Sequence, residues 1–131
     1  MTVSIALAAP PPNIRRGPIA SEEQTHRALI DYLKIAAKPG VHWHHCPNGG
    51  HRAPKTAATL KAMGARAGIP DLTLIAGGKV TFLELKRERG GRLSPPQIAM
   101  HQELRNAGAA VITCQGFDSA VEALRMAGLC R

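Results

Sequence analysis

Two strand-like runs joined by a pair of glycines constrain the fold of this chain more than any other part of its sequence. The first run is DLTLIA at residues 71–76, the second is KVTFLELK at residues 79–86, and Gly77 and Gly78 lie between them. Two adjacent glycines favour a two-residue β-turn, because its central residues take positive φ angles. The sequence therefore predicts a tight antiparallel hairpin.

The register of this hairpin brings two acids together, because it places Asp71 directly opposite Glu84. Opposed side chains have Cβ atoms roughly 4.5–5.5 Å apart, so two carboxylates there repel each other, and burial makes both charges costlier. Three arrangements relieve the repulsion: one acid is protonated, the pair lies at an exposed end, or a cation binds between them.

Lys86 lies two residues after Glu84 and therefore projects to the same face of the strand. Its ammonium group could compensate the two acids, or it could take part in hydrolysis beside a bound metal ion. A purely structural alternative also fits this spacing. In that alternative Asp71 caps its strand, and Glu84 forms an ion pair with Lys86 or with an arginine.

The composition favours a polyanionic partner. The 131 residues include 17 Lys and Arg against 9 Asp and Glu, and the formal net charge is +8. Nucleic acid is the first candidate for such a chain, and an anionic membrane surface is the second. An acidic pair that holds a hard divalent ion inside a basic surface is the arrangement that phosphodiester cleavage requires.

Helix and strand signals occur in the order α-β-α-β-β-α-β-α, which is typical of one α/β domain. The expected elements lie at residues 21–37, 41–46, 54–68, 71–76, 79–86, 94–108, 109–115 and 118–128. Ser21, Ser94 and either Asp118 or Ser119 are the expected helix N-caps. The candidate core residues are Leu29, Leu33, Met100, Leu104, Val111, Leu124 and Met126. We expect a flexible, proline-rich N-terminal tail at residues 1–20 and a domain at residues 21–131.

Cysteine usage and hydropathy bear on the cellular location. Cys46, Cys114 and Cys130 show no pairing pattern, which favours reduced thiols. No segment has the composition expected of a signal peptide or of a membrane span. We therefore expect a cytoplasmic protein of a bacterial or phage-infected cell, with no membrane partner and no small-molecule substrate.

Several histidines could take part in binding. The stretch HWHHC could suggest zinc, but a strand puts His42 and His44 on one face and His45 on the other. We favour histidines at the edge of the site or in contact with phosphate. His101 follows Gln97 by one helical turn and is either a residue near the site or a packed histidine.

The ordered motifs PNGG, GIPD, ELK and GRLSPPQ resemble those of the VRR-Nuc family, a branch of the PD-(D/E)xK nuclease superfamily. The resemblance extends over residues 21–127. It implies a restriction-endonuclease-like α/β core, with a central mixed sheet of about four strands flanked by helices. It also implies a Mg²⁺- or Mn²⁺-dependent endonuclease that acts on branched DNA, since small stand-alone members resemble homodimers that cleave Holliday junctions.

The resemblance assigns roles to residues of the hairpin and of two helices. Asp71, Glu84 and the main-chain carbonyl of Leu85 would be metal ligands, and Lys86 would be the catalytic lysine. Gln97, which matches the glutamine of the family's LSPxQ helix, would lie near the metal site.

The first helix would supply a further acid. Glu22 would reach the metal directly or through a water molecule, according to the resemblance. Its neighbour Glu23 leaves open which acid faces the site, although the Ser-Glu order favours Glu22. The family often has a glutamine four residues after the helix glutamate, where this chain has His26.

DNA contacts are expected from the basic and turn residues around the site. These are Asn48, Gly49, Arg52, Lys55, Lys61, Arg87, Arg89 and Arg92. Contacts with phosphates would make binding salt-dependent and would read shape more than sequence. A homodimer is expected because a four-way junction has two scissile strands. Two alternatives stay open: a module that binds branched DNA without cleavage, and a nuclease subunit of a replication or repair assembly that prefers flaps or other substrates.

Overall fold

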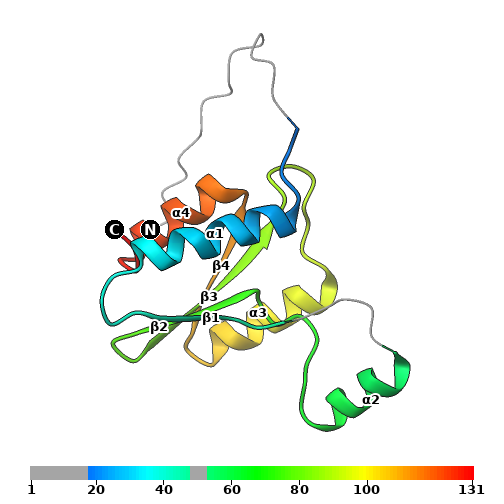
Figure 1. The fold of residues 1–131 in the computed structure, drawn as a ribbon. Helices are drawn as coiled ribbons and strands as arrows, with labels where there is room; N and C mark the ends of the chain where they lie inside the picture. Colours follow the sequence, from blue (N-terminus) through cyan, green and yellow to red (C-terminus); the bar gives the residue numbers. More distant parts are fainter. Residues whose placement is uncertain (1–17, 48–52) are drawn as a thin grey trace.

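The computed structural model describes residues 18–47 and 53–131, and its elements follow the expected order (Figure 1). The helices are α1 (Glu22–Ala36), α2 (Pro54–Ala62), α3 (Pro95–Asn106) and α4 (Phe117–Met126). The strands are β1 (His42–His45), β2 (Leu72–Ala76), β3 (Lys79–Lys86) and β4 (Ala110–Gln115). Within the described ranges, every helix is too short or too polar to cross a membrane.

The strands form one mixed sheet in the order β1-β2-β3-β4. β2 is antiparallel to both β1 and β3, whereas β3 and β4 run parallel. The β2–β3 hairpin has the predicted register, since Ala76 pairs with Lys79 and Leu72 pairs with Leu83. The two glycines between the strands have φ angles of 57° and 78°, as a primed two-residue turn requires. The predicted α/β class with a central mixed sheet is confirmed.

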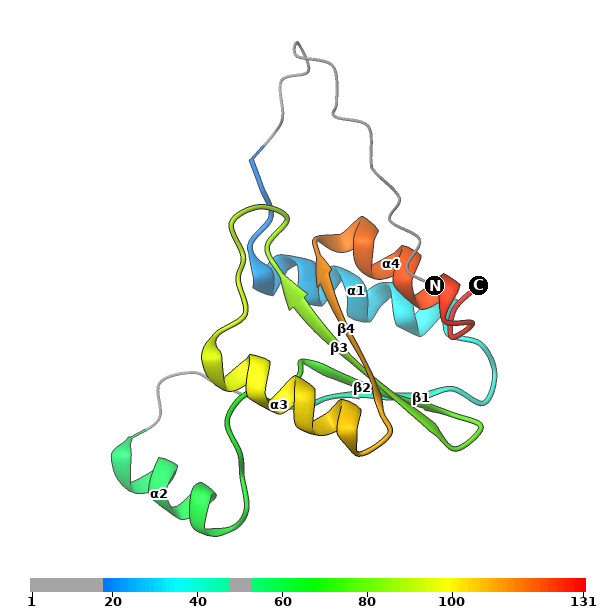
Figure 2. The same cartoon turned by 180° about the vertical axis from the view of Figure 1, so that it is seen from behind.

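Helices cover both faces of the sheet. α1 and α4 lie on one face and α3 lies on the other, as the two opposite views show (Figures 1 and 2). The hydrophobic core includes Leu29 of α1, Leu124 of α4, and Leu83 and Leu85 of β3. Because side chains alternate along a strand, the polar residues of the ELK motif that flank Leu85 project to the opposite face, where α3 lies.

Helix α2 is shorter than predicted and stands apart from the sheet (Figures 1 and 2). It was expected at residues 54–68 but ends at Ala62, and Gly64 follows with a φ angle of 99°. None of its residues is buried. A helix without a buried face gains little from packing, so a glycine with positive φ is enough to end it.

The start of α4 also differs from the prediction. Neither Asp118 nor Ser119 is the N-cap; the cap residue is Gly116, and no side chain caps the helix. Gly116 has a φ angle of 88°, which lets the chain turn from β4 into α4 without a longer connection. The N-caps predicted at Ser21 and Ser94 are confirmed, and each forms a capping box.

The predicted core is mostly confirmed. The buried members of the predicted set are Leu29, Leu33, Met100, Val111 and Leu124. Leu104 is half-buried. The prediction for Met126 was wrong, because 71% of this residue is exposed. It follows Leu124, which is buried, by two residues in the last turn of α4, and this spacing places it on the opposite side of the helix.

Candidate active site

At the end of the hairpin opposite its turn, hydrogen bonds that involve side chains replace the backbone hydrogen bonds between β2 and β3. This site end comprises Asp71 and residues 84–86. The Asp71 N–H donates a hydrogen bond to Glu84 Oε2 at 3.2 Å, and the Leu85 N–H donates to Asp71 Oδ2 at 2.7 Å. The two acids are therefore neighbours, as the register predicts, and each carboxylate accepts one hydrogen bond from a main-chain N–H.

Glu84 is buried against α3. Only 2% of this residue is exposed, and its Oε1 accepts a hydrogen bond from Gln97 Nε2. The same oxygen lies 3.8 Å from Lys86 Nζ, which donates to Gln97 Oε1 at 2.9 Å. The amide of Gln97 thus joins the carboxylate and the ammonium group, which confirms that Lys86 shares the face of Glu84.

The capping box of α3 explains why Gln97 points into this group. Its Oε1 also accepts a hydrogen bond from the Ser94 N–H at 2.8 Å, and the Ser94 hydroxyl accepts one from the Gln97 N–H at 3.4 Å. These bonds turn the Gln97 side chain back toward the first turn of the helix. The side chain of Gln97 therefore caps α3 and also binds Glu84 and Lys86.

Gly68 brings the chain before Asp71 against the same helix turn. A Cβ atom at this position would lie 2.3 Å from the carbonyl oxygen of Pro96, and Gly68 has a φ angle of 84°. Only glycine fits both conditions without strain. The glycine of the GIPD motif is therefore a packing requirement that fixes Asp71 relative to α3.

Burial and the neighbouring acid change the proton affinity of Glu84. Burial is the larger cause, the charge of Asp71 is the second, and together they raise the pKa of Glu84 to about 8, although Lys86 acts in the opposite direction. The raised pKa favours the protonated form of Glu84, because the opposing effect of Lys86 is smaller than those of burial and Asp71. This direction agrees with the first of the three arrangements that relieve repulsion.

The third expected metal ligand is the main-chain carbonyl oxygen of Leu85. The carbonyl of Lys86 accepts a hydrogen bond from the Gly116 N–H on the β4 side. Because the polar groups of successive residues point to opposite edges of a strand, the carbonyl of Leu85 points toward Asp71. Two carboxylates and one carbonyl are the hard oxygen ligands that Mg²⁺ and Mn²⁺ prefer, so this donor set fits a divalent ion.

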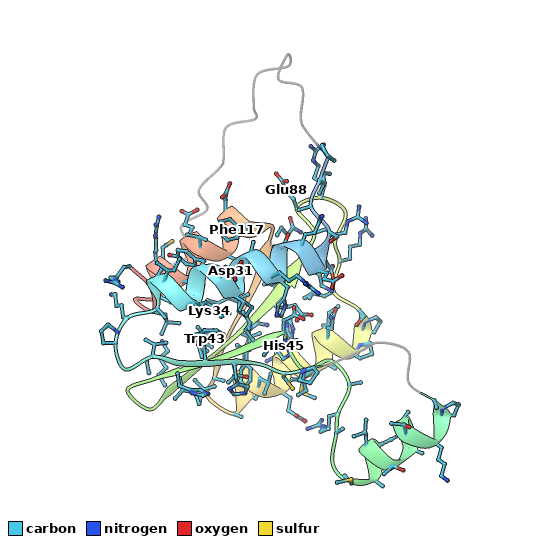
Figure 3. The ribbon with its side chains drawn as sticks, viewed as in Figure 1. Asp31, Lys34, Trp43, His45, Glu88 and Phe117 are labelled. Atoms are coloured by element: carbon cyan, nitrogen blue, oxygen red, sulfur yellow. The ribbon has the colours of Figure 1, made fainter. Side chains whose placement is uncertain are left out.

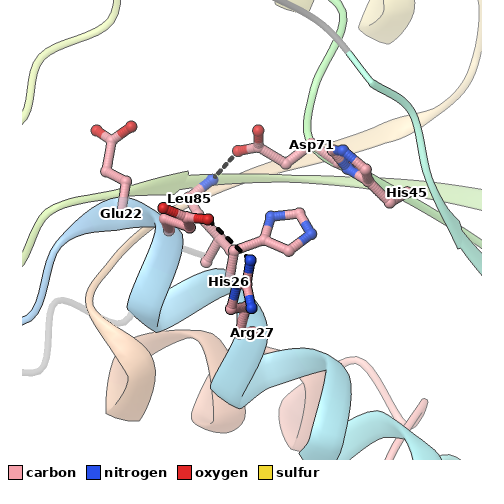
Figure 4. A pocket seen from close by; sticks show the side chains of 7 residues that line it. Glu22, His26, Arg27, His45, Asp71 and Leu85 are labelled. Carbon is pink, nitrogen blue, oxygen red and sulfur yellow. Dashed lines mark hydrogen bonds and ion pairs between the residues drawn. The ribbon is translucent and has the colours of Figure 1, made fainter.

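A pocket of about 440 Å³ opens beside Asp71 on the α1 side of the sheet (Figure 4). Its lining residues are Glu22, Glu23, His26, Arg27, His45, Asp71 and Leu85. Glu23 forms an exposed ion pair with Arg27 at 3.0 Å. Glu22 instead extends to the side of β3 on which the Asp71 carboxylate lies. This arrangement favours Glu22 as the acid that faces the site.

Glu22 does not complete a metal site made of side chains alone. Within residues 18–47 and 53–131, no three His, Cys, Asp or Glu side chains gather closely enough to hold a metal ion. The expected contact of Glu22 through a water molecule does not require Glu22 to be a direct ligand and is compatible with this result. A direct bond from Glu22 to an ion at Asp71 and Glu84 would need the side chain to move.

The strand histidines divide between two faces, as predicted. His42 and His44 are exposed together, with Nε2 of the first 2.8 Å from Nδ1 of the second. His45 lies on the other face, near the start of α1, while Trp43 lies beneath the second half of that helix (Figure 3). Nδ1 of His45 is 2.7 Å from the carbonyl oxygen of Asp71. His45 is therefore a residue at the edge of the site.

His101 is a packed histidine. Only 1% of this residue is exposed, and its ring nitrogens have no hydrogen-bond partner among the described residues. Burial is the main cause that lowers its pKa, and Arg105 and Lys86 contribute next. Its ring is therefore neutral near neutral pH.

The basic residues expected to bind DNA lie in two exposed groups. Lys55 and Lys61 are on α2, and Arg87, Arg89 and Arg92 are in the loop between β3 and α3. Asn48, Gly49 and Arg52 lie outside the described residues, as does the segment 1–17 of the expected tail.

Two contacts were missed by the sequence interpretation. Arg66 forms a two-pronged ion pair with Glu103 of α3, with N–O distances of 2.5 and 2.9 Å. His45 bonds the main chain of Asp71. Neither contact has a signal in the sequence, because each joins residues more than 25 positions apart without a motif that relates them.

Comparison with known proteins points to one family. The family described as "VRR-NUC domain" matches residues 19–118. A solved structure described as "VRR_NUC domain protein" is 21% identical, with a TM-score of 0.68, over 82% of this chain and 88% of that one. A second, described as "VRR_NUC domain", is also 21% identical, with a TM-score of 0.56, over 82% of this chain and 97% of that one. No curated protein matches the sequence.

Proposed function

The chain belongs to the VRR-NUC domain family, which is a family of nucleases, and from this premise we propose that it is a metal-dependent endonuclease that hydrolyses phosphodiester bonds in branched DNA such as Holliday junctions. One observation carries the proposal. The buried carboxylate of Glu84 lies beside Asp71 and 3.8 Å from Lys86 Nζ, at the end of the sheet where the pocket opens. Burial of such a group is costly to folding, and ionisable groups perturbed in this way cluster at functional sites.

The carboxylates of Asp71 and Glu84 and the carbonyl of Leu85 would hold Mg²⁺ or Mn²⁺. A bound ion of this kind supplies Lewis acidity and neutralises charge on a phosphate group. The protein contributes a rigid arrangement of these oxygens, because both carboxylates are already fixed by hydrogen bonds. A bound cation would offset the charge repulsion from Asp71 that contributes to the raised pKa of Glu84.

Lys86 would stabilise negative charge or orient the attacking water. Its residue exposure is only 8%, and Gln97 holds its ammonium group at 2.9 Å. A fixed positive charge in a site with little water stabilises a developing negative charge more strongly than a mobile surface lysine does. Gln97 therefore acts on the reaction through Lys86 and Glu84, and Glu22 faces the same pocket from α1.

DNA binding would rest on the exposed basic groups of α2 and of the loop between β3 and α3. Lys55 and Lys61 on α2 and the arginines of the loop between β3 and α3 can contact phosphates without reading bases. Shape would then select the substrate. A homodimer would supply two sites for the two scissile strands of a four-way junction.

The proposal is tested by cleavage of three labelled substrates: a four-way junction, a 5′-flap and a linear duplex. We expect Mg²⁺-dependent cleavage of a branched substrate in preference to the duplex, no cleavage in EDTA, and no cleavage by a folded Glu84→Ala variant. Cleavage that persists in EDTA, or in the folded variant, would refute the mechanism. Salt-sensitive binding of the junction without metal-dependent cleavage would favour the module that binds branched DNA.

A further inference from the structure

The main chain of Asp71 is held in place by contacts outside the regular sheet. The residue precedes β2, whose first paired residue is Leu72. Four hydrogen bonds with described residues hold Asp71. Two join it to the site end, namely its N–H to Glu84 and its carboxylate to the Leu85 N–H. The other two converge on its carbonyl oxygen.

That carbonyl oxygen accepts two hydrogen bonds from residues at the end of β1. The Cys46 N–H lies 3.1 Å from it, and Nδ1 of His45 lies 2.7 Å from it. Because a carbonyl oxygen only accepts hydrogen bonds, Nδ1 of His45 must carry the proton. Within the described part of the chain, His45 is therefore the one side chain outside the three proposed ligand residues that forms a hydrogen bond with Asp71.

His26 restrains the ring that makes this bond. The two imidazole rings meet edge to face, with centroids 4.4 Å apart and planes 80° apart. His26 stands on α1 one helical turn after Glu22, and both line the pocket beside Asp71. Burial is the main cause that lowers the pKa of His26, followed by His45, so its ring packs as a neutral group. Contacts from α1 thus reach Asp71 through His45.

We propose that His45 is a positioning residue of the metal site: its imidazole Nδ1–H holds the main chain of Asp71 so that the Asp71 carboxylate meets the carboxylate of Glu84. The inference rests on the proposed metal site and adds a residue to it. His45 does not bind the ion. Groups that orient a metal ligand commonly change metal affinity about 10–100-fold when they are removed.

Two substitutions separate the hydrogen bond from the bulk of the ring. The amide nitrogen of asparagine occupies about the place of an imidazole Nδ1, whereas the amide of glutamine lies farther out, about where Nε2 was. His45→Asn should therefore keep the bond to Asp71, and His45→Gln should lose it. His42→Gln is the matched control, because it makes the same change on the same strand at an exposed residue on the other face.

The first readout is Mn²⁺ affinity of the full-length chain, measured by titration with detection of free Mn²⁺ by electron paramagnetic resonance. We expect His45→Gln to weaken binding about tenfold. His45→Asn and His42→Gln should stay within about twofold of the unmodified chain. The inference is overturned if His45→Asn loses as much affinity as His45→Gln, or if neither loses any while Asp71→Asn does.

The second readout needs no metal. The Leu85 N–H donates to the Asp71 carboxylate, so its hydrogen exchange in EDTA reports the position of Asp71. His45→Gln should speed this exchange about tenfold, and His45→Asn should not. Unchanged exchange in His45→Gln contradicts the inference. If Asp71→Asn binds Mn²⁺ as well as the unmodified chain, the proposed metal site is wrong, and the exchange rates alone decide whether His45 positions Asp71.

Discussion

At the turn end of the β2–β3 hairpin, backbone pairing continues to Ala76 and Lys79, and two exposed glycines close the loop with open space around each. At the site end, pairing stops at Leu72 and Leu83, and hydrogen bonds from side chains take its place. The turn end follows from its own residues. The site end depends on β1, α1 and α3, which pack around it.

The contrast shows where regular backbone pairing ends and where side-chain contacts hold the candidate site. A turn can be exposed and mobile at little cost, so its sequence only has to satisfy local backbone geometry. A site must keep two carboxylates and an ammonium group at fixed positions, which requires contacts from distant segments. Matched substitutions at the two ends should therefore differ in their consequences, and the differences can be ranked.

The largest difference is expected between two lysines of β3. Lys86→Ala should lower the cleavage rate about 10²–10³-fold, because it removes the buried positive charge next to Glu84. Lys79→Ala removes an exposed lysine at the turn end and should leave the rate within about twofold. Single-turnover cleavage of the four-way junction measures both. Equal losses of cleavage rate in the two variants would mean that Lys86 contributes only to the overall positive charge of the protein, and not to the chemistry at Glu84.

Two glycines give the next comparison. Gly68→Ala should destabilise the fold by about 3 kcal/mol, because the new Cβ would meet Pro96 and the φ angle is positive. Gly78→Ala has a similar φ angle but open space, and should cost only about 1 kcal/mol. Urea unfolding of the two variants gives both values. A Gly68→Ala variant as stable as Gly78→Ala would show that α3 yields easily at its first turn.

A smaller effect is expected from pH. A carboxyl group whose pKa is raised in the folded protein binds more protons when folded, so its contribution to stability falls as pH rises from the ordinary value toward about 8. In EDTA, the contribution of Glu84 to the free energy of unfolding should drop by about 3 kcal/mol between about pH 5.5 and pH 8.5, whereas the lowered pKa values of His26 and His101 act in the opposite direction. Glu84→Gln, which resembles the protonated acid, should remove most of this drop, whereas Glu88→Gln at an exposed position should not. Parallel slopes for the unmodified chain and Glu84→Gln would contradict the assignment.

The smallest effect is expected at the ion pair between Arg66 and Glu103. Both side chains are more than half exposed, at 58% and 53%, so water screens their attraction. Arg66→Ala should leave the midpoint of urea unfolding nearly unchanged. A loss as large as that of Gly68→Ala would show that this pair also anchors the segment before Asp71 to α3.

The sequence predicted the hairpin register, the strand that carries Lys86 and the N-cap at Ser94 because each depends on neighbouring residues. Those local rules also predicted that Glu84 and Asp71 would meet. The contacts of Gln97 with both Glu84 and Lys86 followed only in outline, from the family resemblance. The early end of α2 was not predicted, because a helix without packing has no apolar pattern to mark its limit.

The bond from His45 to Asp71 shows the limit most clearly. It joins the end of β1 to the start of β2, and the strand alternation in HWHHC predicts only which face each histidine takes. The bond itself depends on how far β1 extends beside β2 and on the ring of His26 from α1. Such information lies in the packing of three elements, and no single stretch of sequence contains it.

The central claim is that the acids at the site end hold a divalent cation. Anomalous diffraction from crystals of the full-length chain grown with Mn²⁺ tests it most directly, because the metal is located without reference to activity. We predict an anomalous peak between the carboxylates of Asp71 and Glu84, beside the carbonyl of Leu85. The peak should vanish in Glu84→Gln. A peak at the exposed pair His42 and His44, with none at Asp71 and Glu84, would contradict the account.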